Sequence, residues 1–131
     1  MQLGGLEQGQ NKLDYFMMVE VPSNVILLDE FAKRFNGFSI GSNDLTQFVL
    51  AVDRDSALLT KRFNENDLAV RTFLKLAVER ARQNNRYIGI CGQAPSDYPD
   101  LGNMLLDAGI SSLSLNPDAV LPFVLRLNGL A

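Results

Sequence analysis

Short apolar runs alternate with segments of helical periodicity along this chain. Four runs have the length and composition of strands buried on both faces, and they span residues 15–21, 38–41, 87–91 and 110–115. Pro, Gly or Asn lies next to each run, and these residues end strands or begin helices. The pattern therefore predicts four strands separated by helices.

Helical stripes follow these runs. Apolar residues recur at i, i+3, i+4 and i+7, which marks the buried face of an amphipathic helix. The stripes are Leu28, Phe31, Ala32 and Phe35; Val70, Phe73, Leu74, Ala77, Val78 and Ala81; Leu101, Met104, Leu105 and Ala108; and Val120, Phe123, Val124 and Leu127. Residues 42–66 are expected to form a long connection before the second stripe. Pro122 is expected to kink the last helix or to delay its start.

This alternation predicts the fold class. Four βα units in a row indicate an α/β protein with parallel strands joined by right-handed helical crossovers. Two architectures fit this pattern: an open, doubly wound sheet, or half of a TIM-type (β/α)8 barrel. A complete barrel takes about 250 residues, and this chain has 131. Residues 1–14 lack periodicity and are expected to form a loose lead-in to a domain in 15–131.

Composition narrows the chemistry. The net charge of −3 argues against a nucleic-acid partner, because phosphate recognition needs a basic excess. The chain has one Cys and no His, which excludes an internal disulfide, histidine-dependent catalysis and histidine zinc sites. Any bound metal must use oxygen ligands, which suit Mg²⁺, Mn²⁺ or Ca²⁺.

The same features predict a location. No uncharged apolar stretch approaches the ~20 residues that cross a bilayer, and the first residues do not resemble a secretion signal. A single Cys suits a reducing compartment. We therefore expect a cytoplasmic protein with no membrane partner.

Polar side chains stand where the predicted strands end. They are Glu20 after the first strand, Ser42, Asn43 and Asp44 after the second, and Cys91 and Gln93 after the third. In both architectures the active site forms at the carboxyl ends of the parallel strands. These side chains are therefore the first candidates for chemistry.

Glu20 and Asp44 are candidate metal ligands. A carboxylate beside a buried strand is costly to ionise unless a cation or hydrogen-bond donors compensate it. Two such groups on neighbouring strand ends would supply the anionic oxygens that Mg²⁺ uses. The alternative is that Glu20 caps the following helix and Asp44 caps a turn.

Cys91 and Arg54 each have two interpretations. A free thiol is most often an inert core group, but at a strand end it could face a substrate and protonate a carbanion or enolate carbon. Arg54 could fork onto a phosphate or carboxylate. Alternatively, it is a surface residue paired with Asp53 or Asp55.

Three motifs, in order, resemble the phosphoenolpyruvate (PEP)-utilising enzymes. They are Phe16-Met17-Met18-Val19-Glu20-Val21-Pro22-Ser23, Gly41-Ser42-Asn43-Asp44-Leu45-Thr46-Gln47 continuing to Asp53-Arg54, and Gly89-Ile90-Cys91-Gly92-Gln93. The family comprises PEP synthase, pyruvate phosphate dikinase and enzyme I of the sugar phosphotransferase system. The residues after Cys91 and the Ser-Leu-Ser-Leu-Asn-Pro-Asp segment are most similar to the synthase branch. The likeness runs from about residue 13 to 127.

The resemblance implies a fold and a reacting centre. It implies that the chain is the C-terminal half of the PEP/pyruvate-binding (β/α)8 barrel. Glu20 and Asp44 match the Mg²⁺ ligands of the family, and Mn²⁺ could replace Mg²⁺. Cys91 matches the acid/base that exchanges a proton with C3 of the enolpyruvate.

The resemblance also implies substrate contacts. Asn43 and Arg54 match residues that hold the phosphate of PEP. Ser42 and Gln93, which stand beside the matched positions, are expected to contact substrate as well. Pyruvate and PEP are therefore the expected small-molecule partners.

Other parts of the family's enzymes have no counterpart in these residues. The resemblance implies a phosphohistidine domain, an ATP-binding domain and four further βα units. We therefore expect a fragment of a synthase that converts ATP, pyruvate and water into PEP, AMP and phosphate, inactive by itself. The alternatives are a non-catalytic, self-associating half-barrel (a homo-oligomer), a phosphotransferase of the pyruvate phosphate dikinase type, and a lyase or mutase of the wider barrel superfamily.

Overall fold

Four parallel strands form the centre of the molecule. The computed structural model describes residues 4–5, 7–53 and 62–130. The strands are β1 (Phe16–Val19), β2 (Gly37–Gly41), β3 (Tyr87–Cys91) and β4 (Ser112–Leu113). The helices are α1 (Pro22–Ile26), α2 (Leu28–Phe31), α3 (Ser42–Leu50), α4 (Leu68–Gln83), α5 (Ala94–Asp97), α6 (Pro99–Ala108) and α7 (Pro117–Leu127), with a 3₁₀ turn η2 (Gln10–Lys12) before β1.

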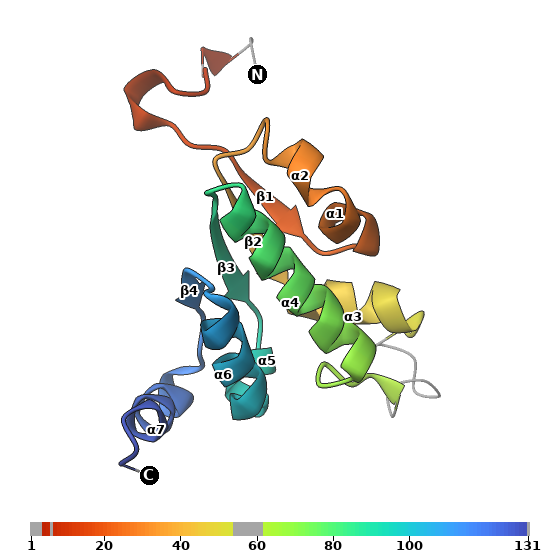
Figure 1. Ribbon diagram of the computed structural model, residues 1–131, viewed down its shortest axis with the longest axis vertical. Coiled ribbons are helices and arrows are strands. Elements are labelled where there is room, and N and C mark those ends of the chain that lie inside the picture. The colour runs from red at the N-terminus through yellow and green to blue at the C-terminus, as the bar shows by residue number, and fades with distance from the viewer. Residues whose placement is uncertain (1–3, 6, 54–61, 131) are drawn as a thin grey trace.

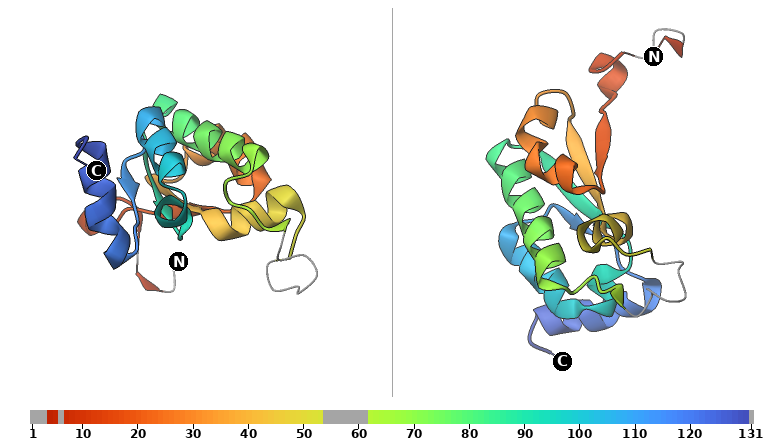
Figure 2. Two further views of the ribbon diagram at one scale, coloured as in Figure 1. Left: turned by 90° about the horizontal axis from the view of Figure 1, so that it is seen from below. Right: turned by 90° about the vertical axis from the view of Figure 1, so that its right-hand side faces the viewer.

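Strand order follows chain order. The sheet reads β1-β2-β3-β4 and every neighbouring pair is parallel (Figure 1). Helices α1, α2, α4 and α6 lie on one face of this sheet, and the views of Figure 2 leave the other face open. A doubly wound sheet has helices on both faces and a reversal of strand order. The arrangement is instead that of four consecutive βα units of a barrel, and the prediction of four parallel βα units is confirmed.

The core lies between the sheet and its helices. Alternate residues of the strands point to this side, and Phe38, Ile40, Ile88 and Ile90 are at most 2% exposed. They pack with the apolar stripe of α4, of which Leu74 is fully buried. The stripe at helical spacing thus identified the correct face of α4.

The opposite face of the sheet is open and carries small residues. By the alternation of strand side chains, Gly37, Ser39 and Gly41 of β2 point to this side. A Cβ atom on Gly37 would collide with the ring of Phe16 from β1. The glycines therefore make room for side chains of the neighbouring strands, and we call this side the open face.

The expected connection over 42–66 is wrong in its first part. Residues Ser42–Leu50 form helix α3, which begins directly where β2 ends. Only Leu45 and Thr46, besides the first residue Ser42, are buried in it, so its apolar stripe was too short to stand out from the sequence. The helix ends at Ala51, whose φ of 53° is left-handed.

Other boundaries also differ from expectation. Strand β4 covers only Ser112–Leu113, and the first expected helix is two helices separated at Leu27, whose ψ of 18° departs from helical geometry. Pro122 neither ends α7 nor delays its start. Pro122 has no N–H to donate to the carbonyl of Asp118. Both residues are exposed, so water can donate a hydrogen bond to that carbonyl instead.

The segment before β1 contacts the rest of the domain. The Gln8 side-chain amide donates to the carbonyl of Arg34 over 2.9 Å and to Oδ1 of Asn36 over 2.7 Å. Among the described residues, no helix has the length and apolar character needed to cross a membrane.

Candidate functional site at the carboxyl ends of the strands

Glu20 follows β1 and lies over the end of β2. Its backbone N–H donates to Oδ1 of Asn24 over 3.3 Å, which fixes the turn from β1 into α1. A Cβ atom on Gly41 would lie 3.2 Å from Oε2 of Glu20 and 3.2 Å from Cε of Met18. The Glu20 carboxylate therefore reaches across the open face above Gly41.

Cys91 ends β3 on the other side of Gly41. The two residues are direct partners in the β2–β3 register. The Cys91 thiol is exposed, donates to the carbonyl of Ile40 over 3.4 Å and accepts from the Ser39 hydroxyl over 3.5 Å. Its exposure disagrees with the interpretation of an inert core thiol.

These contacts put a carboxylate and a thiol on opposite sides of a glycine. Glu20 comes from β1 and Cys91 from β3, while Gly41 between them has no side chain. Gly41 itself is buried, because the side chains of Glu20 and Met18 lie over it, whereas the Cys91 thiol beside it is exposed.

Ser42 follows β2, and its side chain lies against Gly92, the residue that follows β3. It is fully buried, and its hydroxyl has no hydrogen-bond partner among the described residues. A Cβ on Gly92 would collide with this hydroxyl, and the φ of 124° at Gly92 is accessible only to glycine without strain. Both the lack of space and the backbone conformation therefore explain why glycine follows Cys91.

Asn43 and Gln93 line one shallow pocket of about 280 Å³. The pocket lies between the first turn of α3 and helix α5. Its other lining residues are Phe63, Glu65, Asp97 and Tyr98. Two of the predicted substrate contacts thus share a concave surface, separate from the Glu20–Cys91 patch.

Asp44 lies in the first turn of α3 and is partly exposed. Within the described residues, neither Asp44 nor Glu20 has a side-chain hydrogen bond or ion pair. No group of three or more His, Cys, Asp or Glu in this part of the chain could hold a metal by itself. Mg²⁺, however, is usually held by one or two carboxylates together with substrate oxygens and water, and two uncompensated carboxylates fit that donor set.

Two residues of the site were missed from the sequence. Ser39 touches Cys91, and strand alternation together with the β2–β3 register could have found it. Glu65 is 5% exposed and lines the pocket with Asn43. No periodic pattern marks Glu65, since it precedes α4 in an irregular segment. Arg54, the remaining predicted phosphate contact, lies outside the described residues.

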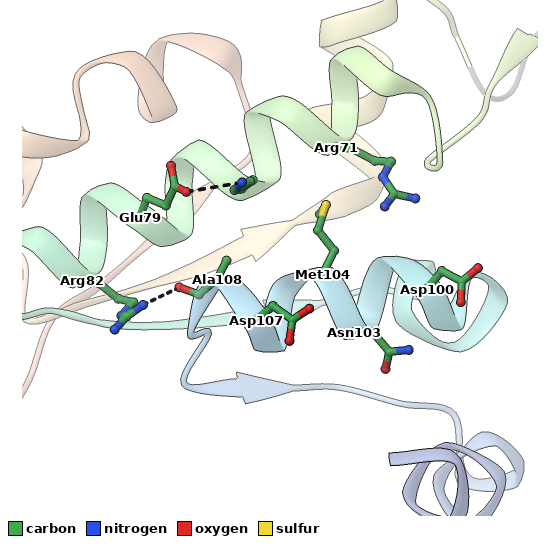
Figure 3. Close-up of a pocket in the computed structure, with 9 residues that line it drawn as sticks. Arg71, Glu79, Arg82, Asp100, Asn103, Met104, Asp107 and Ala108 are labelled. Carbon is green, nitrogen blue, oxygen red and sulfur yellow. Dashed lines mark hydrogen bonds and ion pairs between the residues drawn. The ribbon is translucent and has the colours of Figure 1, made fainter. Parts of the chain in front are cut away.

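A wider pocket lies away from these residues. It measures about 530 Å³ and occupies the groove between α4 and α6, where Arg82 donates to the carbonyl of Ala108 over 2.8 Å (Figure 3). All three basic side chains of the lining, Arg71, Lys75 and Arg82, come from α4, and the acidic ones come from both helices. No predicted site residue lines this groove, so size alone does not identify the candidate site.

Comparison with known proteins identifies the family of this chain. The family model described as "PEP-utilising enzyme, PEP-binding domain" matches residues 4–129. The chain is 58% identical over 123 residues to the phosphoenolpyruvate synthase of Synechocystis, 48% identical over 123 residues to that of Escherichia coli, and 52% identical over 122 residues to that of Aeropyrum pernix. These matches cover 94%, 94% and 92% of this chain.

The same matches cover only 15%, 16% and 15% of the three relatives. The chain therefore spans about one sixth of the length of these curated relatives. The resemblance noted from the three sequence motifs is confirmed, since the family model covers nearly all of the chain. This chain belongs to the PEP-binding domain family of the PEP-utilising enzymes.

Proposed function

We propose that this chain forms part of a PEP/pyruvate site in which Glu20 and Asp44 hold Mg²⁺ and Cys91 exchanges a proton with C3 of the substrate. The observation that carries the proposal is the placement of the Glu20 carboxylate and the exposed Cys91 thiol on the open face, on either side of Gly41. Family membership supplies the substrate class.

The metal site rests on two carboxylates that lack protein partners among the described residues. When bound there, Mg²⁺ supplies positive charge beside the carboxylate and enol oxygens of the substrate. Glu20 and Asp44 hold the ion from the ends of β1 and β2. Without a cation, both carboxylates stay exposed to water at the strand ends.

Cys91 supplies the proton chemistry. In the direction of PEP synthesis, its thiolate takes a proton from the pyruvate methyl group, and the C–H electron pair becomes the C2–C3 double bond as charge moves onto the enolate oxygen. The Ser39 hydroxyl donates to the sulfur and the sulfur donates to the carbonyl of Ile40, so both contacts hold the thiol at the end of β3. In the reverse direction the thiol returns the proton to C3.

The first turn of α3 suits the anionic end of the substrate. Backbone N–H groups at a helix N-terminus favour phosphate and carboxylate, and α3 starts at the strand ends with Ser42 and Asn43. Asn43 and Gln93 offer side-chain amides from one pocket. Arg54 is proposed as the cationic contact to the phosphate.

The complete reaction needs more than these residues. We infer that the parent protein is a synthase that makes PEP, AMP and phosphate from ATP, pyruvate and water. The phosphohistidine and nucleotide-binding domains of that enzyme are the proposed domain partners of this chain. By itself the chain is proposed to bind the enolate end of the substrate without completing the reaction.

Thiol protection tests the proposal. Cys91 is the only cysteine of the chain, so the rate of its reaction with a disulfide reagent reports on this position alone. Oxalate resembles the enolate of pyruvate, and Mn²⁺ with oxalate is expected to slow the labelling of Cys91 several-fold. Neither Mn²⁺ nor oxalate should protect the thiol when added alone.

Two variants make the test specific. Glu20→Gln keeps the shape of the side chain but removes its charge, and is expected to abolish protection. Glu30→Gln removes a charge that is ion-paired with Lys33 on an exposed surface of α2, and should leave protection intact. Equal labelling rates with and without Mn²⁺ and oxalate in the unsubstituted, folded chain would refute the proposed site.

A further inference from the structure

Ser42 and Thr46 place two hydroxyl groups in the interior of the domain. Both residues lie on α3, within the motif of residues 41–47, and both are fully buried. Neither hydroxyl has a hydrogen-bond partner within the part of the chain that the structure describes. Buried polar groups are almost always hydrogen-bonded, because an unpaired group keeps the full cost of leaving water. These two hydroxyls therefore need a partner.

Thr46 turns its hydroxyl away from its own helix. A threonine inside a helix commonly donates a hydrogen bond to the carbonyl four residues earlier. Thr72 of α4 does so, because its hydroxyl donates to the carbonyl of Leu68 over 2.7 Å. Thr46 forms no such bond with the carbonyl of Ser42. The Thr46 hydroxyl is therefore directed at a group outside the backbone of α3.

The two hydroxyls lie on one side of α3. Residues four positions apart in a helix stack on the same face, with Cβ atoms about 5–6 Å apart. The hydroxyls do not bond each other directly, but one water molecule with two hydrogen bonds of about 2.8 Å spans a separation of this size. Ser42 also lies against Gly92, so this side of α3 borders the turn that follows Cys91.

The chemistry of the pair selects a small, neutral ligand. A hydroxyl both donates and accepts a hydrogen bond, and neither of these side chains carries a charge. An ion enclosed here would lose its hydration without receiving a countercharge from the pair. An apolar group would leave both hydroxyls unpaired. Water is neutral and offers both donors and acceptors, so it fits the pair.

We propose that Ser42 and Thr46 bind one internal water molecule on the buried side of α3, beside the turn at Gly92. The water gives each hydroxyl the hydrogen bond that the described residues do not supply. It also assigns a role to Thr46, which the proposed function leaves without one. The inference uses neither the metal site nor the substrate, so it can hold or fail independently of the proposed function.

Oxygen-17 relaxation dispersion of the solvent tests the site directly, because it counts water molecules that stay inside a protein for longer than the protein takes to tumble. Thr46→Val replaces the hydroxyl by a methyl group of similar size, and Ser42→Ala removes only the hydroxyl oxygen. Each variant is expected to lose one long-lived water. Thr46→Ser keeps the hydroxyl and should retain that water. Thr72→Val is the matched control, since the Thr72 hydroxyl is exposed and bonded within α4.

Urea unfolding gives a second measurement, in which a bound water and an unpartnered hydroxyl predict opposite signs. Loss of a water-bound hydroxyl in Thr46→Val should lower the urea midpoint, whereas loss of an unpartnered hydroxyl would raise it. The double variant Ser42→Ala/Thr46→Val should lower the midpoint by less than the sum of the single changes, because both hydroxyls bind the same water. An unchanged number of long-lived waters in the two single variants, a midpoint that rises in Thr46→Val, or strictly additive changes would overturn the proposal.

Discussion

Glycine on the open face decides where the side chains of the site can lie. Gly41 stands between Glu20 and Cys91, and any side chain there would press against the side chains of Glu20 and Met18. Its φ of −87° is accessible to every residue, so the requirement is for space and not for backbone freedom. Gly92 differs, because its φ of 124° demands glycine in its own right.

Gly41→Ala should therefore weaken the metal site without unfolding the chain. The new Cβ lies 3.2 Å from Oε2 and Cβ of Glu20, so the carboxylate must move by a few tenths of an ångström. We expect Mn²⁺ affinity in the presence of oxalate to fall about three- to tenfold, equivalent to about 1 kcal/mol, in a calorimetric titration. Gly4→Ala is the matched control, since nothing lies within 4 Å of its Cβ position. Unchanged affinity in Gly41→Ala would show that Glu20 does not depend on this space.

Ser39 is expected to tune the thiol. Its hydroxyl donates to Sγ of Cys91, and loss of this hydrogen bond leaves the carbonyl of Ile40 as the remaining partner of the sulfur among the described residues. Ser39→Ala should slow the reaction of Cys91 with a disulfide reagent several-fold at neutral pH. Ser23→Ala, in the exposed first turn of α1, should leave the rate unchanged. A rate in Ser39→Ala equal to that of the unsubstituted chain would show that Ser39 does not influence the reactivity of Cys91.

The sequence correctly predicted the helices and strands that have a long periodic pattern of apolar residues. The stripe of α4 and the apolar runs of β2 and β3 gave the right elements because each buries a continuous face against the others. Helix α3 was missed because it buries few apolar residues and begins without a loop after β2. Strand β4 covers only Ser112–Leu113, which is shorter than the predicted run over 110–115.

The candidate site was predictable in its members but not in its geometry. Residues at the ends of strands could be picked out as soon as the strands were placed, which is how Glu20, Asp44 and Cys91 were found. Their relative positions depend on strand register, and Ser39 became visible only through the pairing of Gly41 with Cys91. Glu65 is buried in the pocket with Asn43 through a tertiary contact that no local pattern reports.

Helix α4 provides the sharpest stability test at this scale. Leu74 is fully buried against the sheet, whereas Leu68 in the same helix is 79% exposed. Leu74→Ala should lower the free energy of unfolding by about 2–5 kcal/mol through lost burial and a cavity. Leu68→Ala should change it by less than about 0.5 kcal/mol. Urea unfolding followed by circular dichroism compares the two, and equal effects would contradict the described packing of α4.

At the scale of the whole molecule, the chain carries four βα units and about one sixth of the length of its relatives. The open face, the unpaired edges and the site all lie on surfaces that a complete barrel would enclose. The candidate site and the exposed apolar side chains of the strands therefore share one face. Its apolar side chains would be covered by closure, whereas Glu20 and Cys91 would stay at the rim.

The isolated chain is expected to form no PEP from ATP and pyruvate with Mg²⁺. It contains no histidine, and phosphoryl transfer is proposed to pass through a phosphohistidine on another domain of the parent. A coupled assay for PEP checks this prediction, with a full-length synthase as positive control. PEP formation that depends on Cys91 in the isolated chain would contradict it.

We propose that the ends of β1, β2 and β3 form a metal-dependent enolate site within this chain by itself. Calorimetric titration of oxalate into the chain, with and without Mn²⁺, tests it most directly, with Glu20→Ala and Asp44→Ala as site variants and Glu30→Ala as control. We expect oxalate binding that requires Mn²⁺, is lost in both site variants and persists in the control. Absence of metal-dependent binding in a chain that is folded by circular dichroism would contradict the claim.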